Sequence, residues 1–302
     1  MPKINYGKLP TEQTNPRTKN IDRLSTAQIL TIINQEDHSV FKAVAKATPS
    51  IERGVEIIVR SIKKGGRLFF AGAGTSGRLG VIEAAECPPT FNTPPALVQA
   101  FMAGGKKAVF RSQEGAEDRR DEGFRILSKK LKKEDVLVGI AASGVTPFVR
   151  GAMEAAKKID AATILITCNP SAHSKKLIDC LIAPRTGPEV ISGSTRLKAG
   201  TATKLVLNML TVTSMIQLGK VYQNWMVDLQ PKSRKLKARA LRLIEHLGGV
   251  SPQDADKHLR LARNQTKLAI LMAKKRYDYK TACAKLKSAG GYLQKAISNS
   301  IE

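Results

Sequence analysis

Gly72-Ala73-Gly74-Thr75-Ser76-Gly77 follows the apolar run Leu68-Phe69-Phe70-Ala71 and precedes a helix-like segment that reaches Glu86. A strand, a glycine turn and a helix N-terminus in this order form an anion pocket, because unpaired N–H groups and the positive end of the helix dipole converge there. The motif therefore predicts phosphate binding. A tight turn without a ligand uses glycines in the same way and is the alternative.

The glycine spacing also fits G-x-G-x-x-G, the pattern of dinucleotide-binding turns. That interpretation needs an acidic residue about 20 positions further on to hold a ribose hydroxyl, and the chain has Val98-Gln99-Ala100-Phe101-Met102 there. Thr75 and Ser76 instead place hydroxyl groups inside the turn, which suits the terminal oxygens of a compact phosphate monoester. The sequence thus favours a phosphate monoester over a dinucleotide.

A chain of 302 residues with 42% hydrophobic content can bury a substantial core. No apolar run is long enough to span a membrane and the N-terminus lacks a signal-peptide core, so we expect no membrane association and a cytoplasmic location. The cysteines and histidines lack the spacing of metal ligands, which predicts reduced thiols and no structural metal. They are Cys87, Cys168, Cys180, Cys283, His38, His173, His246 and His258.

The formal net charge of +25 raises the question of nucleic-acid binding. From Lys232 to Glu302 the chain has 17 Lys and Arg against 5 Asp and Glu, and the remaining surplus is spread thinly over the other residues. Aromatic side chains that stack on single-stranded bases are few in this region, namely Tyr277, Tyr279 and Tyr292. We therefore interpret the surplus as a solvated basic face and expect no nucleic-acid partner; an acidic surface or a nucleic acid is the alternative.

Apolar runs that alternate with helical segments predict an α/β fold with a doubly wound parallel sheet and flanking helices. The expected strands are residues 67–72, 96–103, 135–142, 162–168 and 177–183, and the expected helices between them are 76–87, 116–131 and 147–158. A long helix from about Arg196 to Val221 follows.

Helices are also expected before the sheet. One opens at residues 24–26, a second is capped by Asp37 or Ser39, and a third covers residues 49–64 and stops at Gly65-Gly66.

The composition changes after Pro231 to short, basic, amphipathic helices. Their expected breaks are Gly248-Gly249, Asn264-Gln265 and Gly290-Gly291. The predicted parts of the chain are N-terminal helices (1–64) that pack on the next domain, a phosphate-binding α/β domain (65–230) and a small all-helical C-terminal domain (231–302).

A second polar turn, Ala141-Ala142-Ser143-Gly144-Val145-Thr146-Pro147, ends another expected strand and opens another helix, with Pro147 suited to the first helical turn. Ligands of open parallel sheets bind at such carboxyl ends. We therefore expect Ser76, Ser143 and Thr146 to approach one phosphate. Two ordinary helix N-caps are the alternative.

Six motifs of the chain are Gly-Ala-Gly-Thr-Ser-Gly-Arg-Leu-Gly (72–80), Glu-Cys-Pro-Pro-Thr-Phe (86–91), Glu-Gly-Ala-Glu-Asp (114–118), Ile-Ala-Ala-Ser-Gly (140–144), Gly-Ser-Thr-Arg-Leu-Lys-Ala-Gly-Thr (193–201) and Lys-Leu-Val-Leu-Asn-Met-Leu (204–210). Together they resemble the N-acetylmuramic acid 6-phosphate etherase family, which belongs to the sugar isomerase (SIS) fold family. The likeness extends from Thr11 to Gly291, nearly the whole chain.

The resemblance implies a SIS-type sugar-phosphate-binding domain over residues 65–230 and a homodimer. It also implies a lyase that cleaves the D-lactyl ether of N-acetylmuramic acid 6-phosphate to N-acetylglucosamine 6-phosphate and D-lactate, without metal or organic cofactor, in amino-sugar and cell-wall recycling. A non-catalytic regulator of the SIS family that senses a sugar phosphate is the alternative.

Such an elimination needs two groups, because a base must remove the C2 hydrogen made acidic by the open-chain aldehyde and an acid must protonate the departing C3 oxygen. The resemblance implies that Glu86 is the acid and Glu117 the base. It also implies polar partners for the ligand beside those in the two turns; the expected contacts are Gly74, Thr75, Ser76, Ser143, Gly144, Thr146, Glu114 and Arg196, with Lys198 as a further partner.

The same residues have plainer interpretations from their pattern alone. Glu86 lies three positions after Glu83 and is compatible with an exposed pair on one helix face. Glu114, Glu117 and Asp118 are compatible with first-turn acids that stabilise a helix N-terminus. Arg196 and Lys198 are compatible with charges that neutralise the long helix.

An acidic Glu86 must keep its proton near pH 7 against a reference pKa of about 4.3, so we expect its side chain to be buried. If residues 76–86 form one straight helix, ten residues at about 1.5 Å each separate Glu86 from the phosphate turn by about 15 Å. Either the helix breaks near Gly80, or Glu86 serves a site shared with a second subunit, which we favour.

The chain also departs from the family pattern. Val145 stands where an Arg is usual and Asn92 where a Gly is usual, and Arg119-Arg120 follow a cluster that is generally more acidic. Loss of a cation at position 145 is expected to weaken the anchoring of the phosphate or of the lactate carboxylate.

Overall fold

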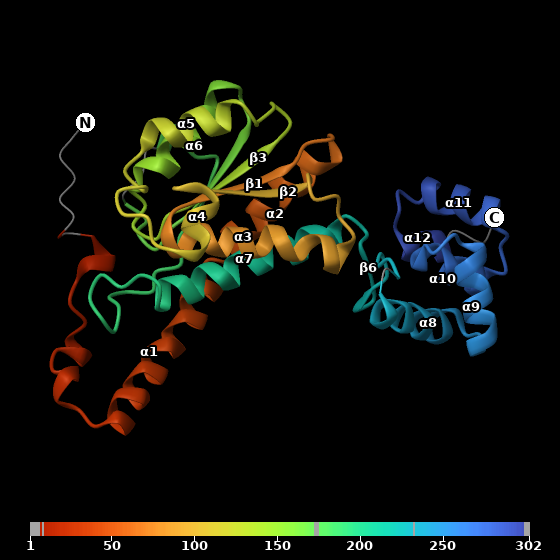
Figure 1. The fold of residues 1–302 in the computed structure, drawn as a ribbon, viewed down its shortest axis with the longest axis horizontal. Coiled ribbons are helices and arrows are strands. Elements are labelled where there is room, and N and C mark those ends of the chain that lie inside the picture. Colours follow the sequence, from red (N-terminus) through yellow and green to blue (C-terminus); the bar gives the residue numbers. More distant parts are fainter. Residues whose placement is uncertain (1–6, 8, 172–174, 232, 299–302) are drawn as a thin grey trace. The chain divides into compact units, whose positions relative to one another are not determined.

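The structure is a computed structural model that describes residues 7, 9–171, 175–231 and 233–298; His173 and Lys232 therefore lie outside the described residues. The chain forms two compact units, Met1–Ala85 with Pro95–Thr211, and Glu86–Pro94 with Val212–Glu302. The first contains a parallel sheet and the second consists mainly of helices (Figure 1). Within the described part, no helix combines the length and the apolar character needed to cross a membrane.

A five-stranded parallel sheet forms the centre of the first unit, with the strand order β2-β1-β3-β4-β5. The strands are β1 (Leu68–Gly72), β2 (Val98–Met102), β3 (Val136–Ile140), β4 (Ala162–Ile166) and β5 (Cys180–Ile182). Each lies within the range expected for it, and the predicted doubly wound parallel sheet is confirmed. Because β2 and β3 pair with opposite edges of β1, the strand order reverses between β1 and β3.

One face of the sheet is covered by α6 (Pro147–Lys158), which packs on β1, β3 and β4, and α5 (Arg120–Ser128) packs on α6. Phe148 of α6 shares a buried cluster with Phe69 and Leu137 of the strands. The bounds of α6 are those expected from the sequence, whereas α5 is shorter than the expected helix over residues 116–131.

The other face carries α2 (Thr48–Lys63), α3 (Gly74–Phe91) and α7 (Lys198–Gln217) (Figure 1). A Cβ atom on Gly80 of α3 would lie 3.0 Å from the Cβ of Phe70, so this glycine lets the helix pack closely on β1. The helix continues through Gly80 without interruption, and the alternative of a break there is wrong. A short helix that the sequence did not predict, α4 (Gly105–Phe110), follows β2.

The N-terminal part begins with short 3-10 helices and continues into one long helix. These elements are Pro10–Glu12, Pro16–Thr18, Ile21–Arg23 and α1 (Thr26–Lys46). Ser25 caps α1 in a capping box with Gln28, at the position that the sequence predicts. The expected start of another helix at Asp37 or Ser39 is wrong, because the buried stripe of α1 continues past both residues.

After α7, the described residues of the second unit form a two-stranded hairpin followed by short helices. They are β6 (Val221–Tyr222), β7 (Trp225–Met226), α8 (Arg234–Gly248), α9 (Pro252–Leu261), α10 (Thr266–Lys275), α11 (Tyr279–Ser288) and α12 (Leu293–Ser298). The predicted helical region after residue 230 is confirmed. Gly249, with φ +69°, ends α8 where the glycine pair predicts a break. The hairpin was missed because strands of two residues show no alternation.

Candidate active site

The two polar turns lie side by side at one edge of the sheet. Gly72 and Ile140, the last residues of β1 and β3, are register partners, so the turn 73–77 adjoins the turn 141–147. The strand order reverses at this same place, and open parallel sheets bind their ligands at such reversals. The structure thus brings together the two segments that the sequence predicts to hold a phosphate.

The first turn carries α3 across the end of β1. A Cβ atom on Gly77 would lie only 2.8 Å from the carbonyl oxygen of Gly72, so the close crossing requires glycine. The helix starts at Gly74, which has φ +53°, and Thr75 and Ser76 occupy its first turn with partly exposed side chains. Because first-turn N–H groups have no acceptor within a helix, they can donate to an anion together with these hydroxyls.

The second turn is held from behind by the chain itself. The N–H of Gly144 donates to the carbonyl oxygen of Ala141 at 2.9 Å, and the Asn169 side-chain amide donates to the carbonyl oxygen of Ser143 at 3.0 Å. Thr146 occupies the N-cap position of α6, yet its side chain makes no capping hydrogen bond. The interpretation of Thr146 as an ordinary N-cap is therefore wrong, and its hydroxyl remains suited to a ligand.

The acidic loop between α4 and α5 reaches the same edge. The N–H of Phe148 donates to the carbonyl oxygen of Glu117 at 2.9 Å, which ties this loop to the first turn of α6. A cavity of about 130 Å³ is lined by Gly74, Arg78, Glu114 and Glu117, among others. Both glutamates are exposed. The structure thus joins the predicted acidic residues to the glycine turn, although neither glutamate lies in the first turn of a helix as the plainer interpretation holds.

The start of α7 approaches the first turn from another direction. A Cβ atom on Gly200 would lie 3.6 Å from the Cγ2 atom of Thr75. Arg196 is exposed just before the helix. Lys198 is buried, and its Nζ atom pairs with Glu36 at 2.6 Å. Its charge is therefore committed within the protein, and the expectation that Lys198 is a polar partner of the ligand is wrong.

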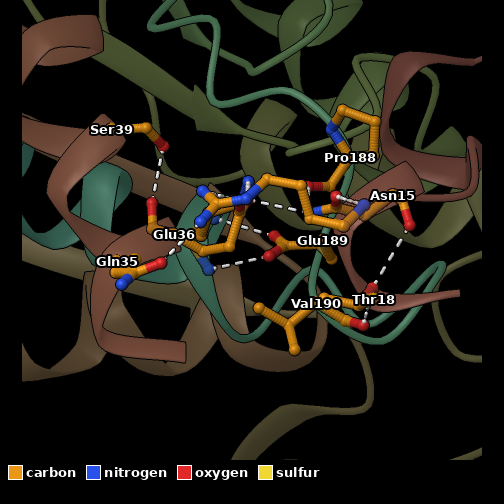
Figure 2. Close-up of polar contacts among 11 residues, drawn as sticks. Asn15, Thr18, Gln35, Glu36, Ser39, Pro188, Glu189 and Val190 are labelled. Carbon is orange, nitrogen blue, oxygen red and sulfur yellow. Dashed lines mark hydrogen bonds and ion pairs between the residues drawn. The ribbon is translucent and has the colours of Figure 1, made fainter. Parts of the chain in front are cut away.

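Glu36 of α1 joins three segments that are distant in the sequence (Figure 2). Its Oε2 atom accepts from the Asn15 side chain at 2.8 Å and from Lys198, and its Oε1 atom accepts from Arg17 at 2.9 Å. Burial raises the pKa of Glu36, but the hydrogen bonds from Lys198 and Asn15 and the two nearby cations outweigh it and hold the pKa below its usual value. No pattern in the sequence singles out Glu36.

Glu189 occupies the N-terminus of α7. Its carboxylate accepts from the backbone N–H groups of Lys198 and Ala199, both at 2.9 Å (Figure 2). Burial raises the pKa of Glu189, although these two hydrogen bonds oppose the shift. Because the chain's own carboxylate fills this helix end, the N–H groups of Lys198 and Ala199 are not available to a bound anion.

Glu86 lies on the part of α3 that belongs to the second unit, and its side chain is exposed. The expectation that Glu86 is buried is therefore wrong for the single chain. Glu83 is buried instead, and it accepts hydrogen bonds from the side chains of Asn208 and Thr211 on α7. The interpretation of Glu83 and Glu86 as an exposed pair is also wrong, because Glu83 faces α7.

The described residues contain no group of three or more His, Cys, Asp or Glu side chains that could hold a metal ion. Cys168, whose backbone N–H donates to the carbonyl oxygen of Ala142 in the second turn at 2.9 Å, is buried, and burial raises the pKa of its thiol to about 11. The thiol therefore stays protonated at neutral pH and is a poor nucleophile.

Comparison with known proteins reveals similarity over nearly the full length. The chain is 47% identical over 290 residues to an N-acetylmuramic acid 6-phosphate etherase of Geobacillus thermodenitrificans, which covers 96% of this chain and 98% of the relative. It is 50% identical over 291 residues to an enzyme of the same name from Rhizobium rhizogenes, which covers 96% and 95%. A family model described as the glucokinase regulatory protein N-terminal SIS domain matches residues 50–157. Among solved structures, a phosphoheptose isomerase from Francisella tularensis is similar over 62% of this chain and 98% of its own, with 18% identity and a TM-score of 0.48.

Proposed function

The chain belongs to the N-acetylmuramic acid 6-phosphate etherase family, and we propose that it is a carbon–oxygen lyase that converts N-acetylmuramic acid 6-phosphate and water to N-acetylglucosamine 6-phosphate and D-lactate. The observation that carries this proposal is the meeting of the turns 73–77 and 141–147 with the loop of Glu114 and Glu117 at one sheet edge. A sugar held there by its 6-phosphate can present its reacting carbons to a carboxylate.

The reaction proceeds from the open-chain aldehyde form of the sugar. Glu117 removes the C2 proton, the electron pair of that bond forms a C2–C3 double bond, and the bond from C3 to the lactyl oxygen breaks. Glu86 gives its proton to the departing oxygen, which releases D-lactate. Glu86 then takes a proton from water as the hydroxyl adds to C3, and Glu117 returns its proton to C2, so that both carboxyl groups regain their starting states.

Phosphate binding in this proposal rests on the two turns. The hydroxyls of Thr75, Ser76, Ser143 and Thr146 and the N–H groups beside Gly74 donate to the phosphate oxygens. Gly144 shapes the second turn, Arg196 is a further cationic contact, and Glu114 is a polar contact of the sugar. We also propose a cytoplasmic enzyme of amino-sugar and cell-wall recycling, on the strength of the resemblance of the sequence to the family.

We further propose a homodimer in which Glu86 of one copy serves the site of the other. Because α3 runs unbroken from Gly74 to Phe91, Ser76 and Glu86 are separated by about 15 Å of helix. The phosphate and C3 of one sugar are closer together than that. A second copy also gives the exposed Glu86 a surface against which its proton can be shielded from water.

The direct test is incubation of the purified protein with N-acetylmuramic acid 6-phosphate and enzymatic assay of D-lactate. Release of D-lactate together with N-acetylglucosamine 6-phosphate is the expected result. A sugar-phosphate-sensing regulator would bind the same compound without releasing lactate, and that outcome would favour the second candidate, for which the match to a regulatory-protein SIS domain speaks.

Mixing two inactive variants tests the shared site. Glu86→Gln and Glu117→Gln homodimers each lack one group in every site, whereas a mixed dimer has one complete site if Glu86 acts in the other copy's site. After denaturation and joint refolding, we expect roughly a quarter of the wild-type activity, since half of the dimers are mixed and each has one active site. Recovery of no activity would show that both residues act from the same chain.

A further inference from the structure

Arg78 lies one helical turn after Gly74, in the cavity that also contains Glu114 and Glu117. Among the described residues that line this cavity, Arg78 is the one cation. The side chain is partly buried, and the proposed reaction gives it no part. It is therefore the cationic group placed beside the proposed base.

The orientation of the Arg78 guanidinium is fixed from one side. Its Nε atom donates to the carbonyl oxygen of Val109 at 2.9 Å, and its Nη2 atom donates to that of Ala108 at 2.8 Å. Both carbonyls belong to the last residues of α4. Since a guanidinium has five N–H donors in a planar fork, the Nη1 and Nη2 end keeps donors for a planar, bidentate acceptor.

We infer that Arg78 binds the carboxylate of the substrate's lactyl group and so selects a sugar phosphate that carries an acidic ether substituent. This inference rests on the proposed function. The base removes the proton on C2 and the lactyl ether is on the adjacent C3, so the lactyl group must lie close to Glu117, where Arg78 is. Arg78 and Glu117 line the same cavity, so a carboxylate bound to Arg78 lies beside the proposed base.

The other anion of the substrate, its phosphate, has separate donors in the turns 73–77 and 141–147. Arg78 also supplies a positive charge in a site where Val145 offers none and where two glutamates would otherwise repel a carboxylate. The lactyl carboxylate is therefore the anion that Arg78 fits. The experiment must distinguish this contact from binding of the phosphate by Arg78.

The experiment compares two ligands that differ in the lactyl group. Calorimetry on Glu117→Gln protein, in which proton removal is blocked, gives the Kd of N-acetylmuramic acid 6-phosphate and of N-acetylglucosamine 6-phosphate. Adding Arg78→Met should weaken the first ligand by roughly 10- to 100-fold, the range for a lost charge-assisted hydrogen bond. It should change the second by less than about twofold, since that ligand has no carboxylate. Arg78→Lys, which keeps the charge without the fork, should lie between.

Arg111→Met is the matched control, because Arg111 is exposed immediately after α4 and does not line the cavity. It should leave both affinities unchanged, which separates a specific contact from the general positive field. Thermal unfolding of each variant checks that the chain is still folded.

Equal weakening of both ligands by Arg78→Met would assign Arg78 to the phosphate or to folding. No weakening of either ligand would leave Arg78 as a partner of the α4 carbonyls alone. Each result overturns the inference. Failure of wild-type protein to release lactate would refute the etherase proposal instead, while the affinity difference would still report on Arg78.

Discussion

The hydroxyl groups of the second turn, at the sheet edge, make weak capping hydrogen bonds or none. Thr146 stands at an N-cap without capping, and the Ser143 hydroxyl accepts only a long 3.4 Å bond from the N–H of Val145. The N-cap of α9 differs from Thr146, since Ser251 accepts from the N–H of Asp254 at 3.1 Å. The hydroxyls at the edge therefore contribute little to folding and are available to a phosphate.

Ser76→Ala and Ser143→Ala should each weaken the binding of N-acetylglucosamine 6-phosphate. In turnover of N-acetylmuramic acid 6-phosphate, each should raise KM more than it lowers kcat. Phosphate contacts exist in the ground state and in the transition state alike, so their loss affects mainly binding. Each lost charge-assisted hydrogen bond costs about 1.5–3 kcal/mol, or roughly 10- to 100-fold in Kd. Calorimetry provides the measurement and Ser128→Ala, at the exposed end of α5, the control. Unchanged affinity in both variants would refute the pocket.

At the scale of elements, the start of α7 is fastened to the N-terminal segment through one buried ion pair. Glu36→Gln leaves the ammonium group of Lys198 buried without its carboxylate, with both side chains less than one-tenth exposed in the wild type. Breaking such a pair costs about 3–5 kcal/mol in the free energy of unfolding, measurable by urea denaturation. Glu122→Gln is the control, because Glu122 pairs at 3.6 Å with an Arg119 side chain that is 60% exposed, and it should cost less than about 1 kcal/mol. Equal stability of the two variants would contradict the anchoring role of Glu36.

The same ion pair predicts a dependence of stability on pH. Burial raises the pKa of Glu36, but the hydrogen bonds from Lys198 and Asn15 and the charges of Lys198 and Arg17 together lower it by more. The folded-state pKa therefore lies below the ordinary value of 4.5. The carboxylate then stabilises the folded chain above the unfolded-state pKa, and this contribution is lost as the pH falls through the folded-state pKa. Denaturation at a series of pH values below 4.5 should show a steeper loss for wild type than for Glu36→Gln. Parallel curves would contradict this assignment.

The sequence predicts well those helices whose first residues are typical of a helix start. Pro147 starts α6 and Ser25 caps α1 where expected. The predicted start of a helix at Asp37 or Ser39 was wrong, because Asp and Ser occur both as N-caps and within a continuing helix. The residue type alone does not distinguish the two positions. A glycine such as Gly80 has the same ambiguity: it permits either a break or close packing, and only the neighbouring Phe70 decides between them.

The candidate site was predictable only in part for a related reason. The turns around Ser76 and Ser143 follow from motif and strand order, because parallel neighbouring strands end at one edge. Glu36 and Glu189 were missed since their roles arise from partners far away in the sequence. The exposure of Glu86 is likewise a property of the packed helix, and its sequence neighbours do not determine it.

At the scale of the whole molecule, the charge of +25 is a matter of surface rather than of fold. The basic residues at the start of α8, such as Arg234, Lys235 and Lys237, are exposed. Part of this charge is compensated within the second unit, where Asp256 pairs with Lys237 at 3.6 Å and with Arg260 at 3.3 Å. The division of the chain into residues 1–64, 65–230 and 231–302 stays a prediction.

We expect the C-terminal helices to bind polyanions weakly and without selectivity. Retention on heparin should disappear at moderate salt, because contacts between exposed charges and a polyanion are screened and weaken steeply as salt rises. Stepwise salt elution gives the measurement, and a Lys235→Glu and Lys237→Glu double variant should elute earlier than wild type. A sequence-selective nucleic-acid complex at physiological salt would contradict the interpretation of this surface as a solvated basic face.

The division of labour between Glu117 and Glu86 is tested most directly by hydrogen exchange at C2 of N-acetylmuramic acid 6-phosphate in deuterated water, followed together with D-lactate release. Because proton removal precedes cleavage of the C3–O bond, Glu86→Gln should stop lactate release and still exchange the C2 hydrogen slowly, whereas Glu117→Gln should abolish both. A missing acid or base costs roughly 100-fold to 10,000-fold. Normal exchange in Glu117→Gln with none in Glu86→Gln would reverse the two roles, and undiminished lactate release in both variants would contradict the proposed mechanism.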